Sequence, residues 1–327
     1  MTLPWLDALP EPIISAPMTG ASGGRLAAAV TAAGGLGMMG FAFAATPEVV
    51  ARECAVARGD ALPDGTGAAF GVGLMLWVLE DHPEVLDEVI EQRPALLSLS
   101  FGDPTRFVPR ARRAGVTVCT QVGTVEEARR ALDAGVDLLV ARGSEGGGHG
   151  RGEVATLPLL QQVLEVCDVP VAAAGGIGTA RGVAAVLAAG AVAAWVGTSF
   201  AACTESEAAD SLKQAIIDRD SADTVYTRAF DVAQRFGWPA VYGGRALAND
   251  FTQEWAERVG ELEVEVAAGE GITSRMNAAR ASGDISVAPV YAGQSAGLVH
   301  QPRAAAEVMA DLAGFRAHLA AAAQRWA

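Results

Sequence analysis

The sequence feature that most constrains the fold is a series of eight short apolar runs that alternate with longer amphipathic stretches. The runs are Ile13–Met18, Leu36–Gly40, Ala69–Leu74, Ala95–Ser100, Thr117–Gln121, Leu138–Arg142, Val171–Ala174 and Ala194–Gly197. Each run is almost continuously hydrophobic, as expected for parallel strands that are buried on both faces. Eight such strands in a row favour a closed (β/α)₈ barrel, the TIM barrel, over an open doubly wound sheet.

The stretches between the runs carry signals for helix starts and ends. Thr124–Glu127 has the pattern of a capping box, and Thr179 is placed to cap a later helix. Ala-Gly pairs at 33–34, 114–115, 134–135 and 189–190 each separate a helical stretch from the next apolar run. Glycine at these points supplies the left-handed residue that ends a helix, so the pairs predict repeated helix-to-strand loops.

The character of the chain changes between residues 206 and 280. Charged helical segments at 206–220 and 253–268 flank a loop that is rich in aromatic residues and glycine, Phe236–Tyr242. We interpret 206–280 as a helical insertion or lid, too small for a large core of its own, and assign 1–205 and 281–327 to the barrel. A barrel of about 250 residues with this insertion accounts for the 327 residues. The aromatic loop either lines the pocket or packs the insertion.

Charge and composition exclude several classes of function. The chain has 38 acidic and 24 basic residues and a net charge of −14, which argues against binding to nucleic acid or to an anionic membrane. Its single lysine, Lys213, lies in the insertion, which argues against Schiff-base chemistry. Four dispersed cysteines, no signal peptide and no long apolar span predict a cytoplasmic protein. The four histidines are also dispersed, so no metal site is expected.

In TIM barrels the catalytic groups lie at the C-terminal ends of the strands. The sixth run ends in Arg142 and is followed by a loop that contains Gly146–Gly148 and His149. Glycines let a planar ring or a phosphate approach the backbone closely. His149 is therefore predicted to face whatever binds there.

The seventh and eighth runs are followed by Ala174–Thr179 and Gly197–Ser199, each of which opens a helix. In a TIM barrel these two loops form the usual phosphate site. The first loop does not match the dinucleotide motif G-x-G-x-x-G, because Arg181 stands where its last glycine should be. A phosphate site, a loop histidine and no metal together indicate a bound cofactor that carries the chemistry.

Several of these runs resemble the nitronate monooxygenase (2-nitropropane dioxygenase) family, which also contains flavin-dependent enoyl-acyl-carrier-protein reductases and NADH:quinone reductases. The resemblance covers nearly the whole chain. It is carried by the runs Ile13–Met18, Gly143–Gly150, Ala174–Ile177, Val196–Thr198 and Tyr291–Gly297.

The resemblance implies an FMN site and assigns roles by motif position. Ala16, Pro17 and Met18 would lie along the isoalloxazine ring, with Gly71 and Gly73 of the third strand nearby. Gln121 would reach the ring or the ribityl chain. The remaining cofactor contacts would come from Gly147, Gly148, Ala174, Gly175, Gly176, Gly197, Thr198 and Gln294. His149 and Ser295 would be the catalytic residues.

Two positions depart from the family pattern. Gly73 replaces a family asparagine, so one hydrogen bond to flavin or substrate is missing. Gly146 replaces an alanine, a change that should loosen the loop.

The leading hypothesis is the oxidation of small alkyl nitronates by FMN and O₂. His149 would hydrogen-bond the nitro group or, when neutral, remove the α-proton of a nitroalkane. An NAD(P)H-dependent reductase of an enoyl thioester or a quinone is the alternative in the same fold. Because Gly73 replaces the asparagine, a flavin-binding protein without efficient turnover is a third hypothesis. A flavin-free barrel that binds another sugar phosphate is the fourth. A homodimer is left open.

Overall fold

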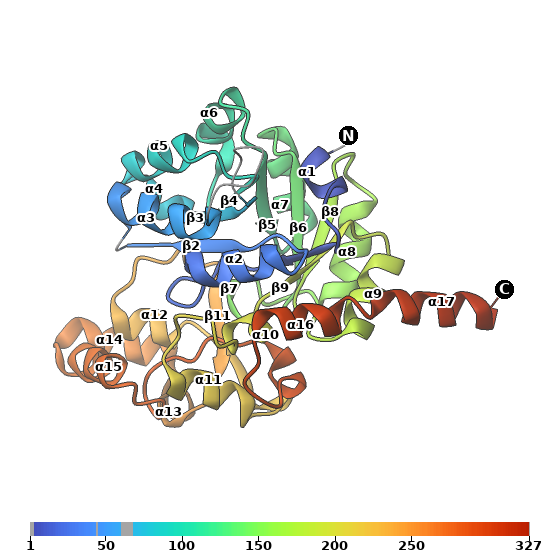
Figure 1. The fold of residues 1–327 in the computed structure, drawn as a ribbon. Helices are drawn as coiled ribbons and strands as arrows, with labels where there is room; N and C mark the ends of the chain where they lie inside the picture. The colour runs from blue at the N-terminus through green and yellow to red at the C-terminus, as the bar shows by residue number, and fades with distance from the viewer. Residues whose placement is uncertain (1–2, 44, 60–67, 327) are drawn as a thin grey trace.

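The computed structural model describes residues 3–43, 45–59 and 68–326. One sheet contains all eight predicted strands: β1 (Ile13–Ser15), β2 (Met38–Phe41), β3 (Gly71–Met75), β4 (Leu96–Ser100), β5 (Val118–Val122), β6 (Leu138–Arg142), β8 (Val171–Ala174) and β9 (Ala193–Val196). Their order is β1-β9-β8-β6-β5-β4-β3-β2, and every pair is parallel. A parallel bridge between Ile14 of β1 and Leu36, two residues before β2, closes the barrel (Figure 1). The predicted TIM barrel is therefore confirmed.

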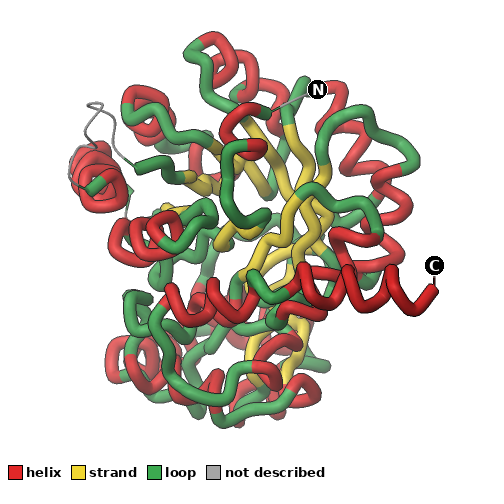
Figure 2. Tube along the Cα trace, turned by 45° about the vertical axis from the view of Figure 1, so that its right-hand side comes forward, coloured by secondary structure: helices red, strands yellow, loops and turns green. Residues whose placement is uncertain are grey.

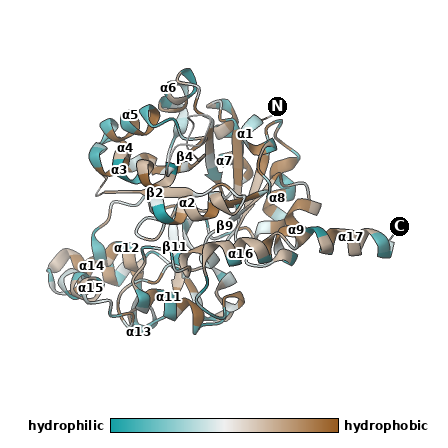
Figure 3. Cartoon of the chain, viewed as in Figure 1, coloured by the Kyte–Doolittle hydropathy of each residue, from teal (hydrophilic) through white to brown (hydrophobic). Residues whose placement is uncertain are grey.

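Helices surround the strands (Figure 2). The barrel helices are α2 (Gly24–Ala32), α3 (Pro47–Arg58), α4 (Leu76–Leu79), α5 (Pro83–Glu91), α6 (Val108–Arg113), α7 (Val125–Asp133), α8 (Thr156–Leu164), α9 (Ala180–Ala188), α10 (Thr198–Ala201), α16 (Ala305–Leu312) and α17 (Phe315–Trp326). Hydrophilic residues gather on outer helices such as α5 and α6 (Figure 3). Along β6, Leu138 and Val140 face the barrel interior, whereas Leu139 and Ala141 pack under the helices. The short helix α1 (Pro4–Asp7) lies next to the interior cluster.

The helix ends follow the predicted signals with one difference. Thr179 Oγ1 accepts a hydrogen bond from Gly182 N–H, and the four Ala-Gly glycines all have left-handed φ angles, as expected. Thr124 Oγ1 accepts from Glu127 N–H, which is half of the predicted capping box. The Glu127 carboxylate, however, accepts from Gly123 N–H at 2.8 Å, one residue before the cap, and its other oxygen accepts from Arg151 Nε.

The segment 206–280 is mainly helical, as predicted, but it also contains two strands. Its elements are α11 (Asp210–Ile217), β10 (Thr224–Thr227), α12 (Ala229–Gln234), β11 (Gly243–Leu247), α13 (Asp250–Trp255), α14 (Val259–Ala268) and α15 (Gly271–Ser282). β11 pairs antiparallel with β10 and with β7 (Gly148–Gly150). β7 lies in the loop Gly143–Gly150 after β6, which we call the histidine loop. Phe230, Phe251 and Trp255 centre a small apolar cluster separate from the barrel core. The boundaries at 205/206 and 280/281 stay a prediction.

No helix within the described ranges is long and apolar enough to cross a membrane.

Candidate active site

The histidine loop is held by a buried arginine at the end of β6. Arg142 donates from Nη2 to the carbonyl oxygens of Gly146 (2.6 Å), Gly147 (3.1 Å) and Gly148 (2.9 Å), and from Nη1 to Arg151 (3.1 Å). Burial lowers the pKa of Arg142 to about 10. A Cβ at position 146 would lie 2.8 Å from Arg142 Nε, so glycine there makes room for the guanidinium group. Gly146 thus permits the hydrogen bonds that fix the loop, which differs from the loosening expected from the sequence.

His149 lies on β7 and is held by residues of the insertion. Its Nε2 is 2.8 Å from Asp231 Oδ1. The Asp231 side chain is buried, with 5% of its surface exposed, and that of His149 is largely enclosed, with 10% exposed. The Trp238 ring stacks on the imidazole with a centroid distance of 3.6 Å and an angle of 3° between the planes. The Tyr291 ring lies 5.2 Å from the imidazole, and burial together with the nearby Asp231 charge raises the pKa of its phenol well above the usual range. The insertion therefore completes the surroundings of His149.

The segment Ala16–Met18, directly after β1, lies against two of the glycines that are predicted to contact the flavin. A Cβ at Gly73 would lie 2.5 Å from Pro17 Cβ, so this backbone geometry accepts only glycine at 73 unless Pro17 moves. A Cβ at Gly197 would come within 3.5 Å of Ala16 Cβ and 3.7 Å of Met18 Sδ. The structure thus brings together five predicted flavin contacts: Ala16, Pro17, Met18, Gly73 and Gly197.

Two other predicted flavin contacts are less well placed. Gly71 lies two residues before Gly73 on β3, and a Cβ there would meet Met38 Cγ at 2.7 Å in the barrel interior. Gln121 is half-buried near the end of β5, where its N–H donates to Ser100 Oγ at 3.0 Å. The roles of Gly71 and Gln121 stay predictions.

The loops after β8 and β9 form a cradle with free donors. Gly175 and Gly176 have φ angles of +112° and +69°, which favour glycine. Within the described residues, the N–H groups of Gly176, Ile177 and Gly178 donate to no backbone oxygen. Ser199 Oγ, in the first turn of α10, is buried and has no hydrogen-bond partner among the described residues.

A cavity of about 400 Å³ adjoins this cradle and is lined by Gly178, Thr179 and Ser199, with Arg181 and His300 among its cationic or titratable residues. Unpaired N–H groups, a helix N-terminus and an unpaired hydroxyl are the groups that bind a phosphate. The residues present therefore fit the phosphate of FMN.

The loop Tyr291–Gly297, which we call the late loop, lies against this cradle. Gly293 N–H donates to Thr198 Oγ1 at 3.0 Å, and Gln294 N–H donates to the Glu145 carbonyl at 2.9 Å. A Cβ at Gly147 would lie 2.5 Å from Gly293 N, so the histidine loop and the late loop are in direct backbone contact. Ser295 lies beside Gly178 in the cradle, since a Cβ at 178 would be 3.1 Å from Ser295 Cβ. The catalytic role of Ser295 and the flavin contact of Gln294 stay predictions.

The sequence analysis missed Asp231. It named Trp238 and Ser199 only as members of the loops 236–242 and 197–199, without a role of their own. Asp231 is 82 positions from His149. Its signal in the sequence was an acidic residue within the apolar run Ala229–Ala233, where a buried charge needs a partner.

Comparisons with known proteins agree with this geometry. The family model described as nitronate monooxygenase matches residues 66–314. A nitronate monooxygenase from Paraburkholderia phytofirmans is 31% identical, over 94% of this chain and 92% of that protein.

Two solved structures are similar over almost their whole length. FabK from Thermotoga maritima has a TM-score of 0.82 and 29% identity, and covers 99% of this chain and 98% of its own. A nitroalkane oxidase from Streptomyces ansochromogenes has a TM-score of 0.81 and 31% identity, with 98% and 99% covered. With the family model matching most of the chain and the barrel and cradle in place, this FMN-dependent enzyme belongs to the nitronate monooxygenase family.

Proposed function

We propose that this enzyme oxidises alkyl nitronates with O₂ and that His149 contacts the reacting part of the substrate. The observation that carries the proposal is the largely enclosed pair formed by His149 Nε2 and Asp231 Oδ1, 2.8 Å apart, next to a loop fixed by Arg142. The relatives named as a nitronate monooxygenase and a nitroalkane oxidase support the substrate class.

The pair defines which nitrogen of His149 acts on the substrate. An ionised carboxylate only accepts hydrogen bonds, so Asp231 holds the imidazole proton on Nε2. The lone pair is then on Nδ1, which can take the α-proton of a nitroalkane. When His149 carries both protons, Nδ1–H instead donates to an oxygen of the anionic nitronate. Asp231 is thus a positioning residue.

The cofactor would be held at two places. The cradle of Gly175, Gly176, Gly197 and Thr198 would bind its phosphate, and Ala16–Met18 would lie along its ring. When bound, FMN accepts electrons from the substrate and passes them to O₂. Trp238 covers one face of the imidazole and holds the ring in place.

The test begins with the absorbance spectrum of the FMN-loaded protein under anaerobic conditions. Propyl-2-nitronate should bleach the flavin bands, and NADH or NADPH should not. His149→Ala should lower kcat/KM by roughly 10²–10⁴-fold while FMN stays bound. His82→Ala is the matched control, because His82 is half-exposed and lies outside the site. Full activity of the His149 variant would remove His149 from the mechanism.

An NAD(P)H-dependent reductase of an enoyl thioester or a quinone is the second candidate, and the likeness to FabK across 99% of the chain supports it. Rapid bleaching by a pyridine nucleotide would establish that function. Full FMN occupancy without bleaching by either reagent would instead indicate a flavin-binding protein without turnover.

The cytoplasmic location, the lack of nucleic-acid partners and a homodimer stay predictions.

A further inference from the structure

Six aromatic side chains from separate segments gather beside His149. We call them the aromatic cluster: Phe43, Trp77, Phe101, Phe236, Trp238 and Tyr242. Centroid distances of 4.8 Å (Phe43–Phe236), 5.0 Å (Phe43–Trp77), 5.2 Å (Trp77–Trp238), 5.0 Å (Phe101–Trp238) and 5.5 Å (Phe101–Tyr242) connect them into one group. Trp238 then joins the cluster to His149 at 3.6 Å. The catalytic histidine therefore lies at one end of a continuous aromatic surface.

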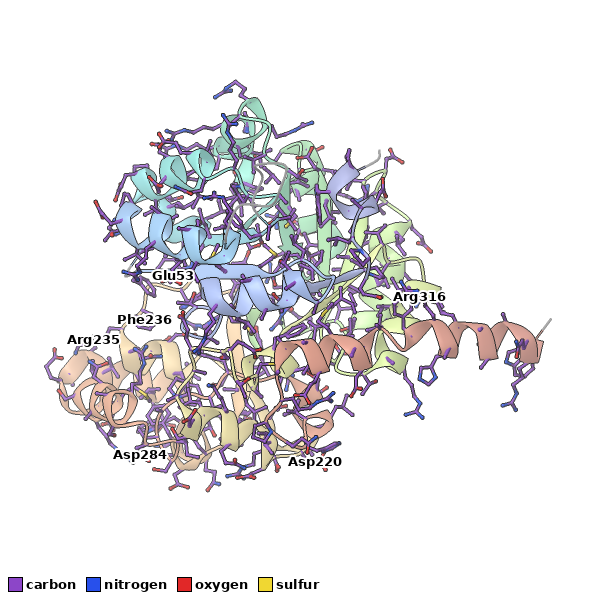
Figure 4. All side chains as sticks on the ribbon, in the orientation of Figure 1. Glu53, Asp220, Arg235, Phe236, Asp284 and Arg316 are labelled. Carbon is purple, nitrogen blue, oxygen red and sulfur yellow. The ribbon has the colours of Figure 1, made fainter. Side chains whose placement is uncertain are left out.

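The cluster spans the barrel mouth and the insertion. Phe43, Trp77 and Phe101 follow the C-terminal ends of β2, β3 and β4, where a TIM barrel binds its substrates. The other three lie between α12 and β11, and Phe236 is found between the insertion and the barrel (Figure 4). The cluster is thus built from both parts of the chain around the same opening.

Two features show that this cluster differs from ordinary core packing. Phe101 has a φ angle of +66°, a left-handed backbone that is unfavourable for a side chain of this size and that is enriched at functional sites. Phe43 is 44% exposed, so the cluster reaches from the largely enclosed His149 to solvent. A core would be closed on all sides, whereas this surface has an open end.

Trp77 adds an observation that points to a ligand. Its Nε1–H is buried and has no acceptor among the described residues. A buried indole N–H is normally hydrogen-bonded. An acceptor supplied by a bound molecule would satisfy it.

We propose that the aromatic cluster binds the substituent on the reacting carbon of the substrate and selects aryl or longer alkyl groups over short ones. Trp238 is the residue that determines this specificity, since its ring contacts His149 directly. The inference rests on the proposed function for the position of the reacting carbon at His149. It adds the substrate class, which is a nitronate with an apolar and preferably planar substituent.

Carboxylates test the inference without turnover, because they share the planar two-oxygen anion of a nitronate. We would titrate the FMN-loaded protein with acetate, hexanoate and phenylacetate and follow the flavin difference spectrum. Hexanoate and phenylacetate should bind roughly tenfold or more tightly than acetate, since each buried methylene favours binding. Trp238→Ala should lose most of this preference. Trp326→Ala is the matched control, because Trp326 is 82% exposed on the terminal helix.

Phe43→Ala provides a second variant for the case in which Trp238→Ala does not fold, and it should also reduce the preference. Equal affinity of the wild type for acetate and phenylacetate would overturn the inference, as would a Trp238 variant that matches the Trp326 control. Turnover of propyl-2-nitronate, measured separately, reports on the proposed function. An enzyme that prefers phenylacetate but does not oxidise nitronates would retain the inference about the cluster and lose the proposed reaction.

Discussion

At the residue scale, the hydrogen bond between His149 and Asp231 lets the Asp231 carboxylate determine which imidazole nitrogen carries the proton. Asp231→Asn keeps the size of the side chain, but its amide can donate as well as accept, so the proton is no longer held on Nε2. We expect kcat at neutral pH to fall roughly tenfold to a thousandfold with unchanged FMN affinity. Asp231→Glu should restore part of the activity. The check is the pH profile of kcat, and a profile identical to that of the wild type in Asp231→Asn would contradict the positioning role.

Removing the Ser199 hydroxyl should affect the stability of the flavin-free protein and its affinity for FMN differently. The hydroxyl is buried without a partner among the described residues, which is unfavourable in the flavin-free protein. Ser199→Ala should therefore leave the Tm of the flavin-free protein unchanged or raise it. The same change removes a donor to the phosphate and should weaken FMN binding by about tenfold, or 1.4 kcal/mol. Fluorescence titration with FMN and thermal unfolding measure the two effects, and unchanged FMN affinity would exclude Ser199 from the phosphate site.

At the scale of elements, Arg142 connects β6 to the loop that carries His149. Arg142→Met would remove the donor to four carbonyl oxygens, one in a buried hydrogen bond and three in partly buried ones. We expect a loss of about 2–4 kcal/mol in the free energy of unfolding, measured with urea. Arg130→Met is the control, because Arg130 is 62% exposed and should change stability by about 0.5 kcal/mol or less. Equal losses in both variants would show that the hydrogen bonds of Arg142 do not stabilise the loop.

The elements also show where sequence reasoning succeeds and where it fails. The eight barrel strands could be predicted because burial on both faces leaves a continuous apolar run in the sequence. β7 could not, since Gly-His-Gly has a low strand propensity and becomes a strand only by pairing with β11. Likewise the glycines that surround His149 could be found locally, whereas Asp231 and Trp238 reach the histidine only through the folding of the insertion.

At the scale of the whole molecule, the barrel and the insertion have separate apolar clusters but share the active site. The strand pair β7–β11, the bond from His149 to Asp231 and the aromatic cluster all cross between the two parts. The cofactor cradle belongs to the barrel, while the surroundings of His149 depend on both. Cofactor binding and catalysis are therefore separable by mutation, since changes in the insertion should affect turnover before they affect FMN affinity.

The cysteines report on the stability of the barrel as a whole. Cys54, Cys119 and Cys203 are buried, and burial raises the pKa of each thiol to about 12. While the barrel stays folded, roughly one of these thiols in ten thousand is the reactive thiolate at pH 8. Cys167 is only half-buried, and its thiol pKa is raised by partial burial.

Ellman's reagent should therefore label one thiol quickly at pH 8 and the other three only when the barrel opens. Cys167→Ser should remove the fast phase, which identifies it. The slow labelling should accelerate as the pH rises above about 8.5, because the opened state, in which the thiols have their ordinary pKa, loses protons there, whereas the folded barrel keeps its thiols protonated up to about pH 12. FMN binds the folded state, so it should slow the three buried thiols and leave Cys167 unaffected. Fast labelling of a second thiol in the Cys167→Ser variant would mean that the barrel opens locally around one of the buried cysteines.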